Sequence, residues 1–266
     1  MSATTDPVTE APGILDRFRL DGRTALVTGG GRGLGLGFTT ALAEAGADVV
    51  IVDRTGSPEA VQAVEARGRR AWSITSDLLA ATPAQLTTLV ADVVALAGRI
   101  DILVNNAGII RREPAMDFSE SSWADVIDLN LSKVFYLSQA CARQMRRQGG
   151  GKILNIASML SFQGGKIVPS YTASKSGVAG LTRALASEWA AEGINVNAIA
   201  PGYMATDNTA PLRAQEDRSA EILSRIPVGR WGTPGDVQGA AVFLASAAAD
   251  YVHGAVLPVD GGWLTR

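Results

Sequence analysis

Short apolar runs rich in β-branched residues alternate along the chain with longer Ala-rich segments, in which apolar residues recur with a helical period. Strands that alternate with helices pair in parallel, and helices then cover both faces of the sheet. The pattern therefore predicts an α/β fold. Seven runs are predicted strands: Thr24–Thr28, Asp48–Val52, Ala71–Thr75, Ile100–Asn105, Lys152–Ala157, Ile194–Ile199 and Ala255–Val259.

Glycines stand just before several of these strands, where the preceding helix has to end. A glycine readily adopts the left-handed conformation that closes a helix, so these positions agree with C-terminal caps. We therefore predict a single Rossmann-type, doubly wound parallel sheet of seven strands with helices on both faces, in one domain over residues 18–266. The predicted caps are Gly46, Gly68, Gly98, Gly149 to Gly151 and Gly193.

Two segments fall outside this regular pattern. Residues 1–17 begin with a polar stretch rich in Thr and Pro, without the charged and apolar regions of a signal peptide, and we expect a flexible tail. Residues 206–230 form the only long excursion between a predicted strand and the next helix, with charges of both signs. Because open parallel sheets bind ligands at the carboxyl ends of their strands, this excursion is predicted to be a substrate lid.

Composition and charge remove several classes of function. The 266 residues carry 24 Lys and Arg against 26 Asp and Glu, a formal net charge of -2, which gives no electrostatic reason to expect a nucleic-acid partner. No apolar run approaches the roughly 20 residues of a membrane-spanning helix, so we expect no membrane partner. The chain has one cysteine, Cys141, and one histidine, His253. We therefore expect no disulfide framework, no bound metal and a reducing, cytoplasmic setting, and proton chemistry falls to Tyr, Lys, Asp or Glu.

A glycine-rich turn follows the first predicted strand and leads directly into the first predicted helix. Glycines there let the chain turn tightly, and backbone N–H groups at the helix N-terminus can then face an anion, which the helix dipole favours. This context predicts a site for the pyrophosphate of a dinucleotide cofactor. The residues expected to bind it are Gly29, Gly31, Arg32, Gly33, Leu34 and Gly35.

Asp53 directly follows the second predicted strand, about 20 residues after the glycine turn, where an acidic side chain accepts hydrogen bonds from the adenosine ribose. Its carboxylate would repel a 2′-phosphate. Arg32 and Arg54 favour the opposite preference, because a guanidinium binds phosphate well, although an Arg beside an Asp is as readily a solvated surface charge. We expect NAD rather than NADP, with Asp53 and Arg54 beside its ribose.

Tyr171 and Lys175 stand four residues apart at the start of a predicted helix, so their side chains share one face. A phenol has an ordinary pKa of about 10, too high for a base at neutral pH, but a neighbouring ammonium favours the phenolate. Such a pair is also common on exposed helices, and other residues decide between the two interpretations. Ser158 follows the fifth predicted strand and Asn105 ends the fourth, at the edge of the sheet that binds ligands. Together with Thr28 they are expected to converge near Tyr171.

Taken together, these residues resemble the short-chain dehydrogenase/reductase family along nearly the whole chain. We find no departure from the family pattern at the matching positions, so the resemblance implies an active, NAD-dependent oxidoreductase that acts on a CH–OH group. The matching positions are Thr28 to Gly35, Asp77, Asn105 to Gly108, Asn130, Ser158, Tyr171 with Lys175, and Pro201–Gly202.

The resemblance also implies a role for each matching residue. Tyr171 is the expected general acid/base, Ser158 holds the substrate oxygen, and Lys175 binds the nicotinamide ribose and lowers the pKa of Tyr171. Asn130 is expected to help order a water for proton relay. The further expected cofactor contacts are Asp77 and Leu78 at the adenine, Asn105, Ala107 and Gly108 on the adenosine side, and Pro201, Gly202, Met204 and Thr206 over the nicotinamide.

Residues 105–113, 157–165, 201–206 and 225–232 resemble the sugar-acid dehydrogenases of this family more closely than the family at large. The resemblance implies a sugar acid of the 2-deoxy-D-gluconate or 2-dehydro-3-deoxy-D-gluconate type as the substrate. The carboxylate of such a substrate needs a cation, and a guanidinium can bind it with two hydrogen bonds. The expected substrate contacts are Arg111, Arg112, Ser158, Gln163, Tyr171 and Tyr203.

Two other functions stay open at this point: reduction of 3-oxoacyl or steroid carbonyls on the same fold, and dinucleotide binding without turnover. The complete set of Ser158, Tyr171 and Lys175 argues against the second. Arg111 and Arg112 favour an anionic substrate over a steroid, but an acyl carrier partner is anionic too. The family resemblance also implies a homotetramer formed through long helices and the C-terminal strand, although Ala-rich faces pack equally well within one subunit.

Overall fold

Seven parallel strands form one sheet in the order β3-β2-β1-β4-β5-β6-β7. The computed structural model describes residues 13–266, and residues 1–12 of the expected tail lie outside them. The predicted fold class is confirmed, and the strand ends differ from the prediction by at most two residues. The strands are β1 (Thr24–Thr28), β2 (Asp48–Asp53), β3 (Ala71–Thr75), β4 (Ile102–Asn105), β5 (Gly151–Ile156), β6 (Ile194–Pro201) and β7 (Val256–Val259).

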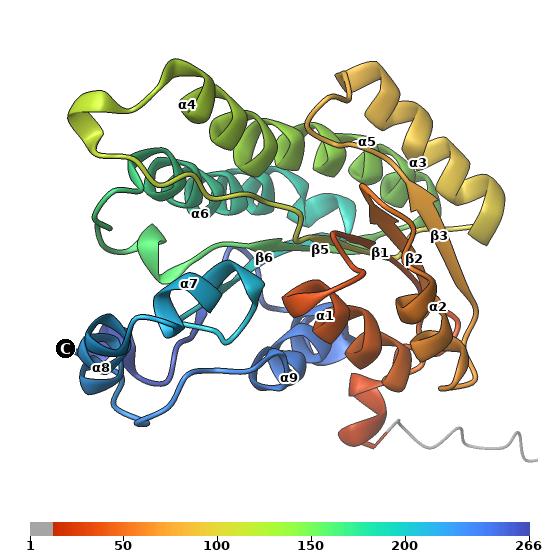
Figure 1. Cartoon of the computed structure of the whole chain (residues 1–266). Helices are drawn as coiled ribbons and strands as arrows, with labels where there is room; N and C mark the ends of the chain where they lie inside the picture. The colour runs from red at the N-terminus through yellow and green to blue at the C-terminus, as the bar shows by residue number, and fades with distance from the viewer. Residues whose placement is uncertain (1–12) are drawn as a thin grey trace, which may run out of the picture.

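Helices cover both faces of this sheet (Figure 1). One face carries α1, α2 and α9, and the other carries α3, α5 and α6, with α4 packed on α6. The helices are α1 (Gly33–Glu44), α2 (Pro58–Glu65), α3 (Pro83–Ala97), α4 (Glu120–Ile127), α5 (Lys133–Gln148), α6 (Pro169–Trp189), α7 (Ala210–Arg213), α8 (Glu216–Arg225) and α9 (Pro234–Ala245). None of the described helices is long and apolar enough to cross a membrane.

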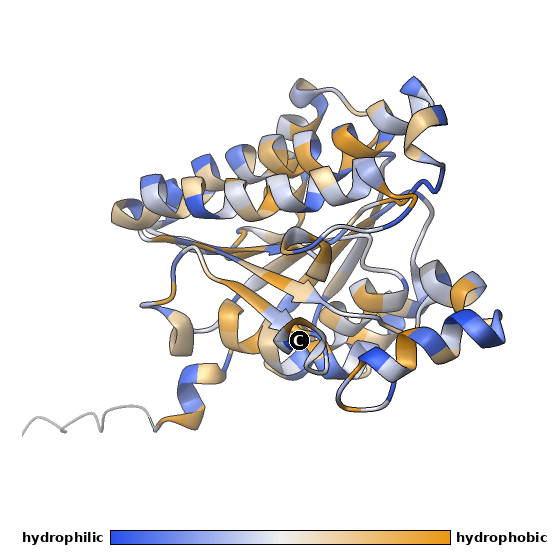
Figure 2. Cartoon of the chain, turned by 90° about the vertical axis from the view of Figure 1, so that its left-hand side faces the viewer, coloured by the Kyte–Doolittle hydropathy of each residue, from blue (hydrophilic) through white to orange (hydrophobic). Residues whose placement is uncertain are grey.

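The alternation of side chains along the strands builds a separate apolar core on each face. In β1, Leu26 joins the core beneath α3 and α5, whereas Ala25 and Val27 join the core that contains Phe38 of α1. All five residues of β1 are buried, as expected for a parallel strand covered on both sides. Figure 2 shows the apolar strands lying between the two helical layers.

The glycine caps predicted from the sequence are present. Gly98 (φ 84°) ends α3 and Gly149 (φ 91°) ends α5, both in the left-handed region that disfavours other residues. These turns join each helix to the next strand and therefore lie at the amino ends of the strands. The loops at the carboxyl ends of the strands form the opposite edge of the sheet.

The segments predicted as tail and lid both contain short helices. Leu15–Phe18 form a 3₁₀ helix, whose Arg17 Nη2 donates a hydrogen bond to the Ala247 carbonyl at 2.9 Å. Residues 206–230 contain a 3₁₀ turn, α7 and α8, and Ile222 of α8 is buried. The lid segment is therefore packed on the domain by an apolar side chain.

Strand order reverses between β1 and β4, because the chain runs outward from β1 to β3 and then returns to β4. The loops that follow β1 and β4 therefore lead to opposite faces and leave a crevice between them, where doubly wound sheets bind their ligands. The functional site has to be sought at this edge.

Candidate active site

The glycine turn after β1 packs tightly against the loop after β4. Gly29 (φ 61°) and Gly33 (φ 53°) adopt left-handed conformations, and a Cβ built on Gly35 would lie only 1.8 Å from the Gly29 carbonyl oxygen. The Asn106 Nδ2 donates to the carbonyl oxygens of Thr28 and Gly29, each at 2.9 Å. The turn can thus follow this path only with glycines, and it presents the N-terminus of α1 to the crevice, a geometry that suits a pyrophosphate.

A small cavity, partly open to solvent, lies beside this turn. The predicted contacts Leu78, Asn105 and Ala107 meet there, and the Thr28 hydroxyl accepts the Ala107 N–H at 3.0 Å. The exposed Asp77 uses one carboxylate oxygen to accept the Leu79 N–H at 3.0 Å. The cavity is lined by Thr28, Leu78, Leu86, Asn105, Ala107, Leu129, Lys133, Val134 and Leu137.

Asn105 and Asn106 make different hydrogen bonds. The Asn105 Nδ2 donates to Ser138 Oγ and to Asn155 Oδ1, each at 2.9 Å, so this side chain joins β4 to α5 and β5. The amide that holds the glycine turn belongs to Asn106, which lies within the predicted segment Asn105 to Gly108. Asn106 directly follows β4, which pairs with β1, and this position in the sequence indicates that its side chain can reach the turn after β1.

Asp53, at the end of β2, faces the glycine turn. Its Oδ2 accepts the Gly31 N–H at 3.2 Å and its Oδ1 accepts the Arg54 N–H at 2.8 Å. A Cβ built on Gly31 would lie 2.3 Å from Ser57 Oγ, so this part of the turn is closely packed. Arg32 and Arg54 are exposed. A carboxylate, and no buried guanidinium, therefore adjoins the turn.

Ser158, Tyr171 and Lys175 are gathered at the carboxyl edge of β5. Ser158 Oγ accepts the Leu160 N–H at 3.1 Å, and Ser158 lies close enough to Tyr171 for its side chain to lower the pKa of the phenol against the effect of burial. Lys175, 5% exposed, donates from Nζ to the Ile156 carbonyl at 2.5 Å, and its Nζ lies 5.6 Å from the centroid of the Tyr171 ring. The three predicted catalytic side chains are thus neighbours, brought together by the end of β5 and the first turns of α6.

The pKa values of this group follow mainly from burial. Burial raises the pKa of the Tyr171 phenol, while the hydrogen bond with Ser158 and the positive charge of Arg112 act in the opposite direction. Burial lowers the pKa of Lys175 to about 8. In the protein alone the phenol therefore keeps a raised pKa, unlike the lowered value expected from the Lys175 ammonium, because loss of hydration outweighs the favourable charges.

Asn130 lies in a π-helical turn, Asp128–Ser132, between α4 and α5. Its amide is fully engaged: Oδ1 accepts the Ile109 N–H and Nδ2 donates to the Ile109 carbonyl, both at 2.9 Å, and Nδ2 also lies 3.3 Å from Ser174 Oγ. A Cβ built on Gly108 would lie 3.0 Å from Asn130 Oδ1. Asn130 therefore ties the loop after β4 to α6.

The segment after β6 lies against the glycine turn from the other side. Gly202 N–H donates to the Val259 carbonyl at 3.0 Å, and a Cβ built on Gly33 would lie 3.9 Å from Thr206. Met204 is buried and pairs with Gly232. The chain from Pro201 to Thr206 thus forms a wall of the crevice.

The two arginines after β4 point in different directions. Arg111 pairs with Asp125 of α4, with 3.4 Å between Nη2 and Oδ2. Arg112 instead lies close enough to Tyr171 and Tyr203 for its charge to lower the pKa of each phenol against the larger effect of burial. Gln163 is half-buried in the loop before α6. Of the two, Arg112 is the arginine that faces the predicted catalytic group.

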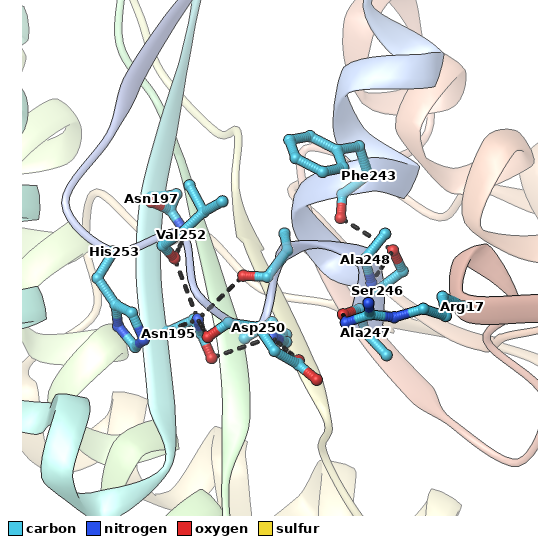
Figure 3. A network of polar contacts seen from close by, with 12 residues as sticks. Arg17, Asn195, Asn197, Phe243, Ser246, Ala247, Ala248, Asp250, Val252 and His253 are labelled. Carbon is cyan, nitrogen blue, oxygen red and sulfur yellow. Dashed lines mark hydrogen bonds and ion pairs between the residues drawn. The ribbon is translucent and has the colours of Figure 1, made fainter. Parts of the chain in front are cut away.

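The single histidine lies at the opposite edge of the sheet. Figure 3 shows His253 beside Asn195, near the start of β6, with 3.1 Å between His253 Nε2 and Asn195 Nδ2. Asn195 also donates to the carbonyls of Ala249, Asp250 and Val252, so this network fastens the segment before β7. Within residues 13–266, no group of three His, Cys, Asp or Glu side chains is arranged to hold a metal ion.

Comparisons with known proteins agree with this geometry. Residues 29–264 match the family model described as enoyl-(acyl carrier protein) reductase. The chain is 60% identical to 2-dehydro-3-deoxy-D-gluconate 5-dehydrogenase of Dickeya dadantii (strain 3937), over 95% of this chain and 100% of that protein. It is 55% identical to the protein of the same name from Bacillus subtilis (strain 168), over 94% of this chain and 98% of that protein. The crystal structure of a gluconate 5-dehydrogenase from Burkholderia cenocepacia J2315, in complex with NADP and tartrate, aligns with a TM-score of 0.90 at 42% identity and covers 96% of this chain and 100% of that chain.

Proposed function

The chain belongs to the short-chain dehydrogenase/reductase family, and we propose on this basis that it is an oxidoreductase that interconverts the secondary alcohol and the ketone of a sugar acid with a nicotinamide dinucleotide. The observation that carries the proposal is the grouping of Ser158, Tyr171 and the buried Lys175 at the carboxyl edge of β5, with Lys175 Nζ 5.6 Å from the centroid of the Tyr171 ring. Relatives that match nearly the full chain are sugar-acid dehydrogenases. This similarity supports a substrate of the 2-dehydro-3-deoxy-D-gluconate or 2-deoxy-D-gluconate type.

The proposed reaction divides the work between cofactor and protein. The bound dinucleotide supplies the hydride acceptor or donor at its nicotinamide. Tyr171 takes the hydroxyl proton as the carbonyl forms and returns it in the reverse direction, while Ser158 holds the same substrate oxygen. Since burial raises the pKa of Tyr171, proton removal near neutral pH depends on the positive charge around the phenol, to which Arg112 contributes.

Lys175 and Asn130 have supporting roles in this proposal. An ammonium has three donors, and the Ile156 carbonyl takes one, so two stay available for the hydroxyls of the nicotinamide ribose. The Asn130 amide is occupied by Ile109 and Ser174. We therefore assign the ordering of a relay water to the main-chain carbonyl of Asn130, in a π-helical turn of the kind that recurs at functional sites.

The dinucleotide fits the residues of the crevice. The turn that a Cβ at Gly35 would block, the cavity beside Leu78 and Ala107, and the carboxylate of Asp53 correspond to sites for pyrophosphate, adenine and ribose. We propose NAD as the preferred cofactor, because a 2′-phosphate beside Gly31 would meet the negative charge of Asp53. The Burkholderia cenocepacia relative holds NADP, so in this chain the choice rests on the residues around this position.

For the substrate, we propose contacts from Arg112, Gln163 and Tyr203, under a lid formed by residues 206–230. Ile222 and Ile226 of the lid region are buried in one apolar cluster with Met159, and Tyr171 and Tyr203 pack against that cluster. This packing supports a lid that borders the substrate site. Arg111, paired with Asp125, is the weaker of the two predicted arginine contacts.

The proposal extends to a homotetramer in the cytoplasm. The exposed positions of α6 include the small residues Ala173, Ser176 and Gly180, which allow the backbone of a second subunit to approach closely. The one cysteine, Cys141, is a buried free thiol, which suits a reducing compartment. Light scattering of the purified protein tests the subunit count, and a monomer at micromolar concentration would contradict it.

A substrate panel tests the function itself. Purified protein is assayed for oxidation with NAD of 2-deoxy-D-gluconate, D-gluconate and simple alcohols. It is assayed for reduction with NADH of the ketone formed by oxidation of 2-dehydro-3-deoxy-D-gluconate and of a 3-oxoacyl thioester. The alcohols and the thioester represent the competing substrate classes. We expect the highest kcat/KM with one of the sugar acids. A preference for the thioester, or no turnover of any member, would reject the proposal.

A further inference from the structure

A small polar cavity lies between α8 and the C-terminal segment, which Figure 1 shows side by side. It is small, with room for about one water molecule or one carboxylate oxygen, and part of it is open to solvent. Its walls include two arginines, one carboxylate and the two aromatic rings that carry a donor group. The lining residues are Tyr203, Arg218, Glu221, Ile222, Arg225 and Trp263.

One wall of this cavity carries a buried donor that lacks a partner. Trp263 is 3% exposed, and its indole N–H makes no hydrogen bond to any residue that the structure describes. The Arg225 guanidinium lies over the same indole ring, with its carbon 4.1 Å from the ring centroid. Buried polar groups are nearly always hydrogen-bonded, so an unpaired N–H beside a cation marks a place for an acceptor supplied from outside the chain.

The balance of charge in the cavity favours an anion. Arg218 is paired with Glu221 on the same helix, which leaves the charge of Arg225 in excess. After burial, which raises the pKa of Tyr203, the largest influences on this phenol are the charges of Arg218 and Arg225, both of which lower it. A carboxylate in the cavity would therefore meet guanidinium groups on α8 and a free N–H on Trp263.

Tyr203 lines this cavity and also packs against the apolar cluster that Tyr171 contacts. The Tyr203 ring lies 4.9 Å from the Trp263 ring and 5.4 Å from the Trp231 ring, centroid to centroid. Tyr203 and Tyr171 pack against the same apolar cluster, which contains Trp263. Arg112 acts on both phenols, whereas the α8 arginines act on Tyr203. Arg112 thus lies near Tyr171, and Arg218 and Arg225 of α8 lie further from Tyr171.

We propose that the cavity on α8 binds the carboxylate of the sugar acid, through Arg218, Arg225 and the Trp263 N–H, while the reacting hydroxyl lies at Tyr171. This inference rests on the proposed function and deepens it. In a six-carbon sugar acid, C5 is four bonds from the carboxylate carbon and C3 is two bonds from it. A carboxylate held beyond Tyr203 therefore selects a hydroxyl remote from the acid group, whereas a carboxylate held by Arg112 would select a near one.

Two variants with opposite expected effects test this site. Arg218→Met should raise KM for 2-deoxy-D-gluconate by about ten- to a hundredfold, the value of one charge-assisted hydrogen bond, and leave kcat nearly unchanged. Glu221→Gln should lower that KM, because it removes a carboxylate that competes for the same guanidinium. With the uncharged amide of 2-deoxy-D-gluconate, both variants should resemble the wild type. Arg225 is left in place, since its contact with Trp263 would confuse binding with folding.

The controls separate recognition from structure. The double variant Arg218→Met with Glu221→Gln keeps the net charge of α8 and should still discriminate poorly between acid and amide. Arg67→Met removes an exposed arginine that follows α2 and pairs with Glu44. This variant should change neither the KM for the acid nor the KM for the amide. Dinucleotide affinity, measured by fluorescence titration, should be the same in all four proteins.

An equal loss on acid and amide would overturn the proposal, as would a Glu221→Gln variant with a raised KM for the acid. It would equally be overturned if Arg112→Met alone removed the preference for the acid. The failure of the proposed function looks different, because the wild type itself would then turn over neither acid nor amide.

Discussion

Replacement of Lys175 by Met should stabilise the folded protein while it stops the reaction. The ammonium is almost completely buried, and burial lowers the pKa of Lys175 from 10.5 to about 8. At neutral pH the folded state is therefore destabilised by the burial of the charged ammonium of Lys175. Met has a similar length and carries no charge, so the variant removes that cost together with the proposed catalytic contact.

The size of the effect follows from two opposing contributions. At about 1.4 kcal/mol for each tenfold change in a protonation equilibrium, the lowered pKa corresponds to about 3 kcal/mol. Against this, the Ile156 carbonyl loses the hydrogen bond from Nζ, at 2.5 Å, which costs about 1 to 2 kcal/mol. We therefore expect the free energy of unfolding to rise by about 1 to 2 kcal/mol near pH 7.

The pH dependence of unfolding is a second test of the direction in which Lys175→Met changes the stability. Between about 8 and 10.5 the unfolded chain holds the Lys175 proton and the folded chain does not, so the stability of the wild type rises with pH in this window. The advantage of Lys175→Met should accordingly be largest below pH 8 and shrink above it. Urea unfolding at neutral and alkaline pH measures it, with Lys166→Met, at an exposed lysine, as the matched control. A variant less stable than the wild type at neutral pH would refute the reasoning.

Three further predictions concern single side chains. Asp53→Asn should raise the kcat/KM ratio of NADP to NAD at least about fivefold, because a unit charge close to a phosphate contributes about 1 kcal/mol or more, and an unchanged ratio would reject the role of Asp53. Gly35→Ala should abolish dinucleotide binding in a titration and lower the free energy of unfolding by about 1 to 3 kcal/mol, since its Cβ would lie 1.8 Å from the Gly29 carbonyl oxygen. Wild-type affinity would contradict the proposed pyrophosphate site at the glycine turn. Burial raises the pKa of Cys141, so an alkylating reagent at about pH 8 should label this thiol only after unfolding in urea, and rapid labelling of the native protein would show that the thiol is accessible.

The sheet could be predicted from the sequence because each strand is a short apolar run and the helices between them have a clear period. The ends of these strands also located Asp53 and Ser158 correctly, since the carboxyl ends of parallel strands share one edge. Tyr171 and Lys175 could be paired because a helix places residues four apart on one face.

The parts that could not be predicted depend on loops and on contacts between distant segments. Arg111 and Arg112 are adjacent in an irregular stretch, where no period tells which of them turns toward Tyr171. The hydrogen bonds from Asn106 to the glycine turn depend on how the loop after β4 packs against the loop after β1, which the pattern of the sequence does not reveal. The raised pKa of Tyr171 depends on how deeply the folded chain buries the phenol, which the spacing of Tyr171 and Lys175 does not reveal.

The central claim is that Tyr171 performs the proton transfer in a sugar-acid dehydrogenase, and the variant Tyr171→Phe tests it most directly. Phe keeps the ring packed in its apolar cluster and removes only the hydroxyl that meets Ser158. Turnover of the best sugar acid is measured beside NADH affinity, by fluorescence titration. We expect a loss of turnover of at least about a hundredfold with unchanged NADH affinity. Turnover near the wild-type rate, with the cofactor bound as before, would contradict it.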